Sequence, residues 1–226
     1  MREIVIDTET TGLDPRGGDR IVEIAAVELL NHLPTGRVFH QYINPERDMP
    51  EGAFAVHGLS TAFLADKPRF AEIAESFLRF VEDGRLVMHN AEFDLGFLNA
   101  ELGRLARPHL PRERAVDTLA LARQKFPGAQ ASLDALCRRF QIDTSARTKH
   151  GALLDAQLLA QVYLELIGGR EPGLALAVSE SVSVSSTITI ERTVREARPH
   201  APSEAEIKAH ATFVATLKPA IWLRPA

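Results

Sequence analysis

The sequence predicts an α/β protein in which helices pack on a sheet. Runs rich in β-branched residues open the chain, and longer segments with apolar residues at helical spacing follow them. A short apolar strand lies between the first two of these helices. Strands early and helices late, with a crossover helix between, are typical of a layered α/β domain. We expect this domain to cover residues 1–169.

Local signals predict the individual elements. A buried strand leads into Asp7, and two more strands are expected at 20–30 and 38–43. The short loop between them favours an antiparallel meander. Residues 44–58 contain two prolines and two glycines and are expected to form a long loop. A further strand is predicted at 86–89, and helices are predicted at 68–81, 92–105, 118–125, 132–140 and 152–167.

The composition is that of a soluble globular protein, with 45% hydrophobic and 25% charged residues in a chain of 226. The single cysteine, Cys137, excludes an intramolecular disulfide framework and suits a reducing compartment. No signal-peptide pattern and no membrane-spanning apolar run is present, so we expect a cytoplasmic protein. The net charge of −4 gives no general attraction to nucleic acid, so a polyanionic substrate would be held by metals and a local groove.

Two acids end the opening strand in the segment IDTETTG, residues 6–12. Side chains alternate along a strand, so Asp7 and Glu9 project from the same face. Two neighbouring carboxylates repel each other unless a cation lies between them, and hard divalent cations take carboxylate oxygens. A strand that ends in solvated acids is the alternative. Gly12 ends the strand and allows the backbone to approach a ligand closely.

A third acid, Asp94, begins a helix in the segment HNAEFDLGFL, residues 89–98. Asn90 is expected to cap this helix, which puts Asp94 in the first turn. There the helix dipole favours a negative charge, and the side chain can point back at the strand ends. An acid in a first turn often does no more than complement the dipole, so Asp94 alone identifies no site.

His150 and Asp155 lie five residues apart in the segment HGALLDA, residues 150–156. On one helix they would be about 140° apart, at ~100° per residue, so they converge only if Gly151 leaves His150 in the preceding loop. Asp155 also falls within an apolar run, where a carboxylate costs free energy unless it is paired or binds a metal. A lone histidine is more often a surface or capping residue.

Together these residues predict a two-metal site. Four carboxylates cannot cluster without about two divalent ions to neutralise them. Two metals roughly 4 Å apart form a clamp for in-line displacement at phosphorus. A histidine beside them can take the proton of the attacking water near neutral pH. The residues concerned are Asp7, Glu9, Asp94, Asp155 and, as the base, His150.

The three segments, in this order, resemble the motifs of the DEDD exonucleases, in their histidine-bearing branch. The run HGALLDAQLLAQVYLELIGG is particularly similar to the proofreading subunits of bacterial DNA polymerase III. This resemblance implies an RNase H-like fold, with a mixed five-stranded sheet, flanking helices and a flexible C-terminal tail that contains a short helix. It also implies 3′→5′ hydrolysis of single-stranded DNA ends, two Mg²⁺ or Mn²⁺ ions held by the four acids, and His150 as general base.

The resemblance further implies which residues meet the terminal nucleotide. Some family members have a glutamate five residues before a substrate-binding histidine, and here that position is Gly52, with Glu51 beside it. The residues expected to bind substrate are Asp7, Glu9, Thr10, Thr11, Gly12, His57 and Asp155.

The composition changes after residue 169. Residues 170–202 are rich in Ser, Pro, Ala and Val and are predicted to be a linker. A capping box at Ser203 starts a helix with one apolar stripe, which predicts a docking segment at 203–226. Folding back onto the main domain is the alternative. By resemblance this segment would bind the polymerase catalytic subunit. Residues 171–176 would make a weak sliding-clamp contact, and a small accessory subunit would be a further partner.

Two rival functions fit the same sequence. A stand-alone RNase T-like exoribonuclease would have the same catalytic centre, but it would need neither a linker nor a docking helix. A non-catalytic interaction subunit would be expected to have lost one of the acids, and all four are present. The leading hypothesis is therefore a proofreading exonuclease that is tethered to a polymerase.

Overall fold

A computed structural model describes residues 1–145, 147, 149–168 and 201–217. These residues fall into two units, one before and one after the predicted linker, and each is described by itself. Residues 170–200 of the predicted linker, which include the clamp segment at 171–176, and residues 218–226 of the predicted docking segment lie outside the described residues. Within the part of the chain that is described, no helix is long and apolar enough to span a membrane.

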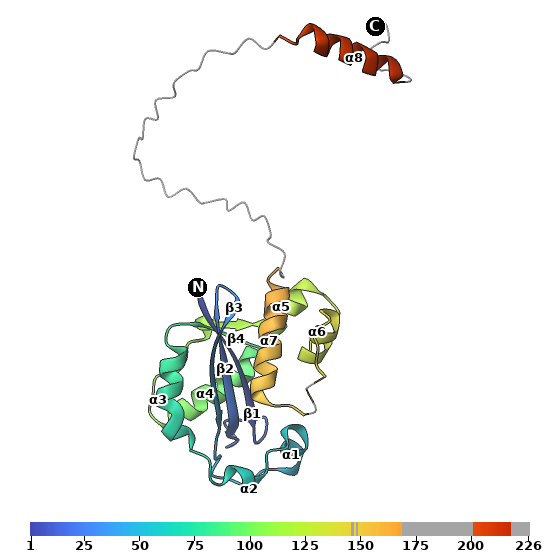
Figure 1. Cartoon of the computed structure of the whole chain (residues 1–226). Helices are drawn as coiled ribbons and strands as arrows, with labels where there is room; N and C mark the ends of the chain where they lie inside the picture. The colour runs from blue at the N-terminus through green and yellow to red at the C-terminus, as the bar shows by residue number, and fades with distance from the viewer. Residues whose placement is uncertain (146, 148, 169–200, 218–226) are drawn as a thin grey trace, which may run out of the picture. The chain divides into compact units, whose positions relative to one another are not determined.

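A mixed five-stranded sheet forms the centre of the first unit, in the order β3-β2-β1-β4-β5 (Figure 1). The first three strands form an antiparallel meander, and β4 and β5 run parallel to β1. These features confirm the predicted sheet. The strands are β1 (Arg2–Thr10), β2 (Ile21–Leu30), β3 (Leu33–Tyr42), β4 (Arg85–Met88) and β5 (Ala115–Asp117).

The third strand begins earlier than predicted. It starts at Leu33 rather than at residue 38 and so takes in Pro34 and Gly36, which were assigned to a loop. β3 lies at the edge of the sheet, where one side of the strand has no ladder partner. A proline without an N–H is tolerated at such an edge.

Helices cover both faces of the sheet (Figure 1). Apolar side chains of α3 (Phe70–Val81) and α4 (Ala91–Arg104) pack on one face. Those of α5 (Thr118–Lys125), α6 (Leu133–Arg139) and α7 (Ala152–Leu166) pack on the other. These five helices confirm the predicted ones, and a short 3-10 helix at Arg112–Arg114 precedes β5.

The prediction of a long loop at 44–58 is wrong in its second half. Residues Glu51–His57 form α1, and Thr61–Leu64 form α2. Pro50 lies at the N-cap of α1, and Gly58 ends the helix with a φ of 75°, in the left-handed region. Proline at the start and glycine just after the end are typical boundaries of a helix, and here they enclose a very short one.

The strand β1 separates two hydrophobic cores by the alternation of its side chains. Ile4 and Ile6 are fully buried against α3 and α4, whereas Val5 is fully buried against the helices of the other face. Asp7 and Glu9 continue the series of Val5, because side chains two residues apart share a face. The fold therefore directs both acids toward the face covered by α7.

A buried hydrogen bond ties α7 to the start of β1. The Tyr163 hydroxyl donates to Glu3 Oε1 over 2.7 Å, and Glu3 is fully buried. His32 Nδ1 lies 2.8 Å from the other oxygen of Glu3. This contact joins the last turns of α7 to the first residues of β1, so it fixes how the two elements that carry Asp7 and Asp155 lie along each other.

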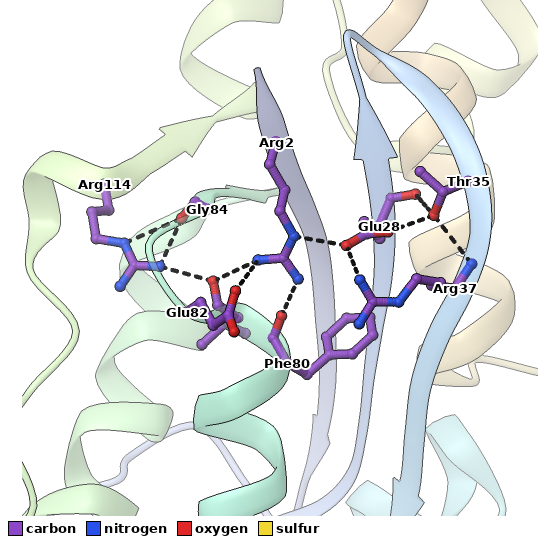
Figure 2. A network of polar contacts seen from close by, with 9 residues as sticks. Arg2, Glu28, Thr35, Arg37, Phe80, Glu82, Gly84 and Arg114 are labelled. Atoms are coloured by element: carbon purple, nitrogen blue, oxygen red, sulfur yellow. Dashed lines mark hydrogen bonds and ion pairs between the residues drawn. The ribbon is translucent and has the colours of Figure 1, made fainter.

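Charged residues close the end of the sheet where β1 begins, as Figure 2 shows. Arg2 donates to Glu28 over 2.7 Å and to the backbone carbonyl of Phe80. Glu28 also accepts hydrogen bonds from Thr35 and Arg37. The network joins β1, β2, β3 and the end of α3, and it leaves the opposite end of β1 free for a functional site.

The described part of the second unit is α8 (Glu204–Thr216). Its predicted capping box is confirmed, because Ser203 Oγ accepts from the backbone N–H of Glu206, and Glu206 Oε2 accepts from that of Ser203. Ile207 and Phe213 are exposed. Of the predicted apolar stripe, Ile207 is exposed but Val214 is buried, and Phe213 lies outside the stripe.

We predict that Tyr163→Phe lowers the free energy of unfolding by about 1–3 kcal/mol, because it leaves a buried carboxylate oxygen without its donor. Urea unfolding measures this loss. Tyr42→Phe is the matched control, since Tyr42 keeps its ring packing against Phe63 and is expected to change stability by less than about 0.5 kcal/mol. Equal effects of the two substitutions would contradict the role of the Glu3 hydrogen bond.

Candidate active site

The candidate site lies at the carboxyl end of β1, where three elements meet. Asp7 and Glu9 come from β1, and Asp155 lies in the first turn of α7, where it is only 3% exposed. Gly151 is the N-cap of α7, so His150 lies in the preceding loop, as the prediction of convergence required. His150 Nδ1 is consequently 3.2 Å from Asp155 Oδ2.

One cluster of ligand atoms could hold a metal ion. Glu9, His150 and Asp155 each offer one atom, and these three atoms lie within 4.8 Å of one another. Carboxylate oxygens are the preferred donors for hard divalent cations, and an imidazole nitrogen can complete such a set. The chemistry of these donors therefore fits a divalent metal ion.

Asp94 reaches the same end of the sheet from the opposite face. It lies in the first turn of α4, as predicted, and is 4% exposed. Its Oδ1 accepts a hydrogen bond from the Thr8 hydroxyl over 2.7 Å. The predicted capping by Asn90 is wrong. Asn90 occupies the N-cap in a left-handed conformation, and its side chain makes no capping bond. Its backbone N–H instead donates to Asp117.

Asp7 and Glu9 are electrostatically linked to the other two acids. Burial raises the pKa of Asp7 well above its usual value, and the charges of Asp94, Glu9 and Asp155 raise it further. Burial followed by the charge of Asp155 raises the pKa of Glu9 to about 8. Burial raises the pKa of Asp94 to about 7, although the hydrogen bond from Thr8 opposes the shift. A bound cation would relieve this excess of negative charge.

A fifth acid adds to the repulsion and was missed from the sequence. Glu23 of β2 lies opposite Glu9 in the antiparallel register, is 3% exposed, and contacts His40 Nε2 over 2.7 Å. Its charge contributes to the raised pKa of Glu9. Cross-strand register would have revealed it, because the second strand was predicted but not aligned to the first.

Arg147 was also missed, although it makes the shortest contacts in the site. Its Nε donates to Asp155 Oδ1 and its Nη2 to Asp155 Oδ2, each over 2.6 Å. Nη2 also lies 2.8 Å from His150 Nδ1, and Nη1 contacts Asp134. The apolar run around Asp155 predicts a carboxylate that is either paired or bound to a metal, and Arg147 provides such a pair. A basic residue three positions before His150 was the available signal.

The remaining predicted substrate residues line one cavity of about 540 Å³. Thr10, Thr11 and Gly12 form one side, and Val56 and His57 of α1 form another, with Phe93 nearby. A volume of this size suits a single small ligand. Glu9 also lines this cavity, so the ligand would lie against the acids.

Gly12 is predicted to let the backbone approach a ligand, and the structure gives a second, steric reason for a glycine at this position. A Cβ atom there would overlap the carboxylate of Asp19. That carboxylate is held in place by Thr11 Oγ1 at 3.1 Å, by the backbone N–H of Asp14 at 3.0 Å and by Arg47. The turn that follows β1 therefore closes only over a residue without a side chain.

A second cavity, of about 630 Å³, lies on the other side of the acids. Asp7, Asp155 and His150 line it together with Arg123 of α5 and residues of the loop before α6. The site thus comprises two cavities near the end of β1, one with Asp7 and Asp155 in its wall and the other with Glu9. This arrangement can hold an extended molecule at its end and along its length.

Comparison with known proteins agrees with this geometry. The exonuclease family profile matches residues 4–163. The DNA polymerase III subunit epsilon of Rickettsia felis is 49% identical over 223 residues, covering 96% of this chain and 97% of the relative. The same subunit of Escherichia coli is 46% identical over 220 residues, covering 92% of this chain and 90% of the relative.

Solved structures show the same fold. Exonuclease X, in complex with 5′ overhanging duplex DNA, has a TM-score of 0.56 and 28% identity, covering 73% of this chain and 90% of that one. The nuclease domain of 3'hExo, a DEDDh family member bound to rAMP, has a TM-score of 0.64 and 18% identity. The match covers 74% of this chain and 91% of that nuclease domain.

Acids and a histidine meet at the end of the central strand of the mixed sheet, within the residues that match the exonuclease profile. The chain belongs to the exonuclease family. Within that family it is similar, over nearly its whole length, to epsilon subunits of DNA polymerase III. The predicted fold, family and 3′→5′ exonuclease function are confirmed.

We predict that, in a metal chelator, the free energy of unfolding falls as the pH rises from 5.5 to 8.5. The pKa values of Glu9 and Asp94 in the folded protein, about 8 and about 7, lie above the ordinary values of 4.5 and 3.8. Between these values the folded state binds more protons than the unfolded state. The contribution of these two groups to the free energy of unfolding is therefore fully present below their ordinary pKa values. It is lost as the pH rises through 7 to 8.

Glu9→Gln is expected to reduce this loss by about 1–3 kcal/mol, because the amide never ionises. Urea unfolding at the two pH values measures it. Glu75→Gln, an exposed acid paired with Arg107, is the control and should follow the wild type. A wild-type stability that rises over this interval would contradict the raised pKa values.

Proposed function

We propose that the chain is the proofreading 3′→5′ exonuclease of a bacterial DNA polymerase III, acting on mispaired single-stranded DNA ends in the cytoplasm and releasing 5′-mononucleotides. The observation that carries this proposal is the convergence of four acids and one histidine from three elements at the end of β1. Such a cluster is too negative to bind a phosphodiester unless cations neutralise it.

Two Mg²⁺ or Mn²⁺ ions held by Asp7, Glu9, Asp94 and Asp155 would supply positive charge at the attacking and leaving oxygens of the phosphodiester. The chain's own residues orient the reaction. Thr8 holds the Asp94 carboxylate in place by its hydrogen bond. His150, at the open edge of the site with 47% of its side chain exposed, takes the proton of the attacking water at a ring nitrogen.

The cavity beside Thr10 and His57 would receive the terminal nucleotide. Leu59 N–H donates to His57 Nδ1 over 3.1 Å, so the proton of the neutral ring is on Nε2. Burial lowers the pKa of His57, which keeps the ring neutral. Among the described residues its buried Nε2 makes no hydrogen bond of ordinary geometry, although the backbone of Thr10 lies near enough to oppose the lowering of the pKa. A buried donor without a partner is costly, and an acceptor on the nucleotide would satisfy it.

A stand-alone RNase T-like exoribonuclease is the second candidate, because the same acids would serve RNA. The extent of similarity favours the polymerase subunit, since the relative from Rickettsia felis aligns over 96% of this chain and is named as a subunit of DNA polymerase III. The exposed apolar residues of α8 are also in keeping with a docking role that a trimming enzyme would not need.

We therefore assign the segment 203–226 to binding the polymerase catalytic subunit. Ile207 and Phe213 of α8 would form part of that contact. Residues 171–176 would make a weak contact with the sliding clamp, and a small accessory subunit would bind elsewhere on the chain.

We expect the purified chain, with Mg²⁺ or Mn²⁺, to release 5′-mononucleotides from unpaired DNA 3′ ends faster than from RNA of the same sequence. Asp7→Asn should reduce this rate by more than about 100-fold, since even outer-shell partners of a metal site can have effects of that size. Asp66→Asn, at an exposed acid, is the control and should keep full activity. Faster cleavage of RNA would favour the exoribonuclease, and an active Asp7→Asn variant would refute the metal assignment.

Deleting residues 171–226 should spare hydrolysis of free single strands, because every residue of the proposed site precedes residue 156. The same deletion should abolish association with the polymerase catalytic subunit. A pull-down with that subunit, run beside a nuclease assay, measures both. Co-purification of the truncated chain would show that the docking surface lies within the first unit.

A further inference from the structure

We propose that Arg147 competes with a divalent cation for Asp155, and that Asp134 receives the guanidinium when the cation binds. The inference rests on the proposed function, in that it takes Asp155 to be a metal ligand. It adds a regulatory contact, because the guanidinium of Arg147 must leave Asp155 before a metal ion can bind there.

The geometry at Asp155 is that of a strong, desolvated ion pair. Both carboxylate oxygens accept hydrogen bonds from Arg147, each over 2.6 Å. The side chain of Arg147 is 8% exposed and that of Asp155 is 4% exposed. A forked, two-bond pair of this kind is the strongest arrangement that an arginine makes with a carboxylate. A cation that binds Asp155 must therefore compete with two short hydrogen bonds.

The same guanidinium also engages His150. A guanidinium has no lone pair, so its contact with His150 Nδ1 over 2.8 Å is a donation to the ring nitrogen. The lone pair of that nitrogen is then unavailable to a metal or to a proton. His150 and Asp155 are two of the three residues in the ligand cluster with Glu9, so Arg147 hydrogen-bonds to two members of that cluster.

Charge favours displacement over coexistence. Four ionised carboxylates carry four negative charges, which two divalent cations would neutralise. A guanidinium left among those cations would be repelled by them, and this repulsion is strong where water is largely excluded. Arg147 would therefore move away from Asp155 when the cations bind.

Asp134 offers the guanidinium a place outside the acids. It lies in the first turn of α6, its side chain is 53% exposed, and it already contacts Nη1 of Arg147. Nη1 does not contact Asp155, so the arginine can release Asp155 while keeping Asp134. Asp134 would then be a positioning residue that acts through Arg147.

The opposite role would be a permanent brace. In that case Arg147 would hold Asp155 in its ligating orientation, and its loss would weaken metal binding. The two roles predict changes of opposite sign in metal affinity, so a binding measurement separates them without any use of catalytic activity.

Mn²⁺ binding to the full-length chain, followed through the electron paramagnetic resonance signal of free Mn²⁺, tests the inference. Arg147→Met, which keeps the length of the side chain without its charge, should bind Mn²⁺ about tenfold more tightly than the wild type, equivalent to about 1.4 kcal/mol. Arg147→Lys should fall between the two, because it keeps the charge but loses the fork. Unchanged or weaker binding by Arg147→Met, with Arg147→Lys no tighter than the wild type, would overturn the inference.

Asp134→Asn provides the second arm. It should weaken Mn²⁺ binding several-fold, because the guanidinium then has only Asp155 to hold. In the double variant with Arg147→Met the Asp134 substitution should have no further effect, since its action passes through the arginine. An equal weakening in both backgrounds would overturn the role of Asp134.

Failure of the proposed function would look different. A wild-type chain that binds no Mn²⁺, or an Asp155→Asn variant that binds it as well as the wild type, would refute the metal site itself. A wild type that binds Mn²⁺ through Asp155, with no tightening in Arg147→Met, would refute only the competition.

Discussion

Repulsion among carboxylates at the end of β1 is the constraint on which the rest of the structure depends. The charges of Asp94 and Asp155 raise the pKa values of both Asp7 and Glu9, and Glu23 adds to this from the neighbouring strand. Folding gains nothing from this arrangement, since each buried charge is costly. The stabilising contacts lie elsewhere, in the two apolar cores and in the buried contact between Tyr163 and Glu3. These contacts hold the strand and helices in place, and the acids are brought together as a result.

The supports come from both sides of the sheet. The alternation of β1 sends Asp7 and Glu9 toward α7, while Thr8 faces the other way and holds Asp94 of α4. The strand β1 therefore positions residues of α4 and α7, which lie on opposite faces of the sheet. A parallel β4 beside β1 brings the start of α4 to the same end of the sheet, because α4 follows β4 directly. Topology, rather than any local motif, makes the four acids neighbours.

Features that depend on neighbouring residues could be predicted from the sequence, whereas contacts between distant residues could not. The spacing of Asp7 and Glu9, the burial of Asp155 and the break at Gly151 are local, and each was placed correctly. Glu23 and Arg147 were missed because cross-strand register and a loop contact depend on the assembled fold. The helix at 51–57 was missed because proline and glycine are as typical of a loop as of the two ends of a short helix. Asn90 makes no capping bond from its N-cap position, where its backbone is left-handed rather than in the extended conformation usual for a capping residue.

The paired cavities bear on how such an enzyme would recognise an error. The cavity of about 540 Å³ is large enough for one small ligand. One part of its wall is the continuous segment Thr10, Thr11 and Gly12, whose side chains are short or absent. Nothing in that wall is suited to distinguish one base from another by its edge. Selection would then come from fraying: a terminus that has already lost its partner enters at little cost, whereas a matched one must first be melted. The preference for mispaired ends would thus be set by the free energy needed to separate the terminal base pair, before hydrolysis begins.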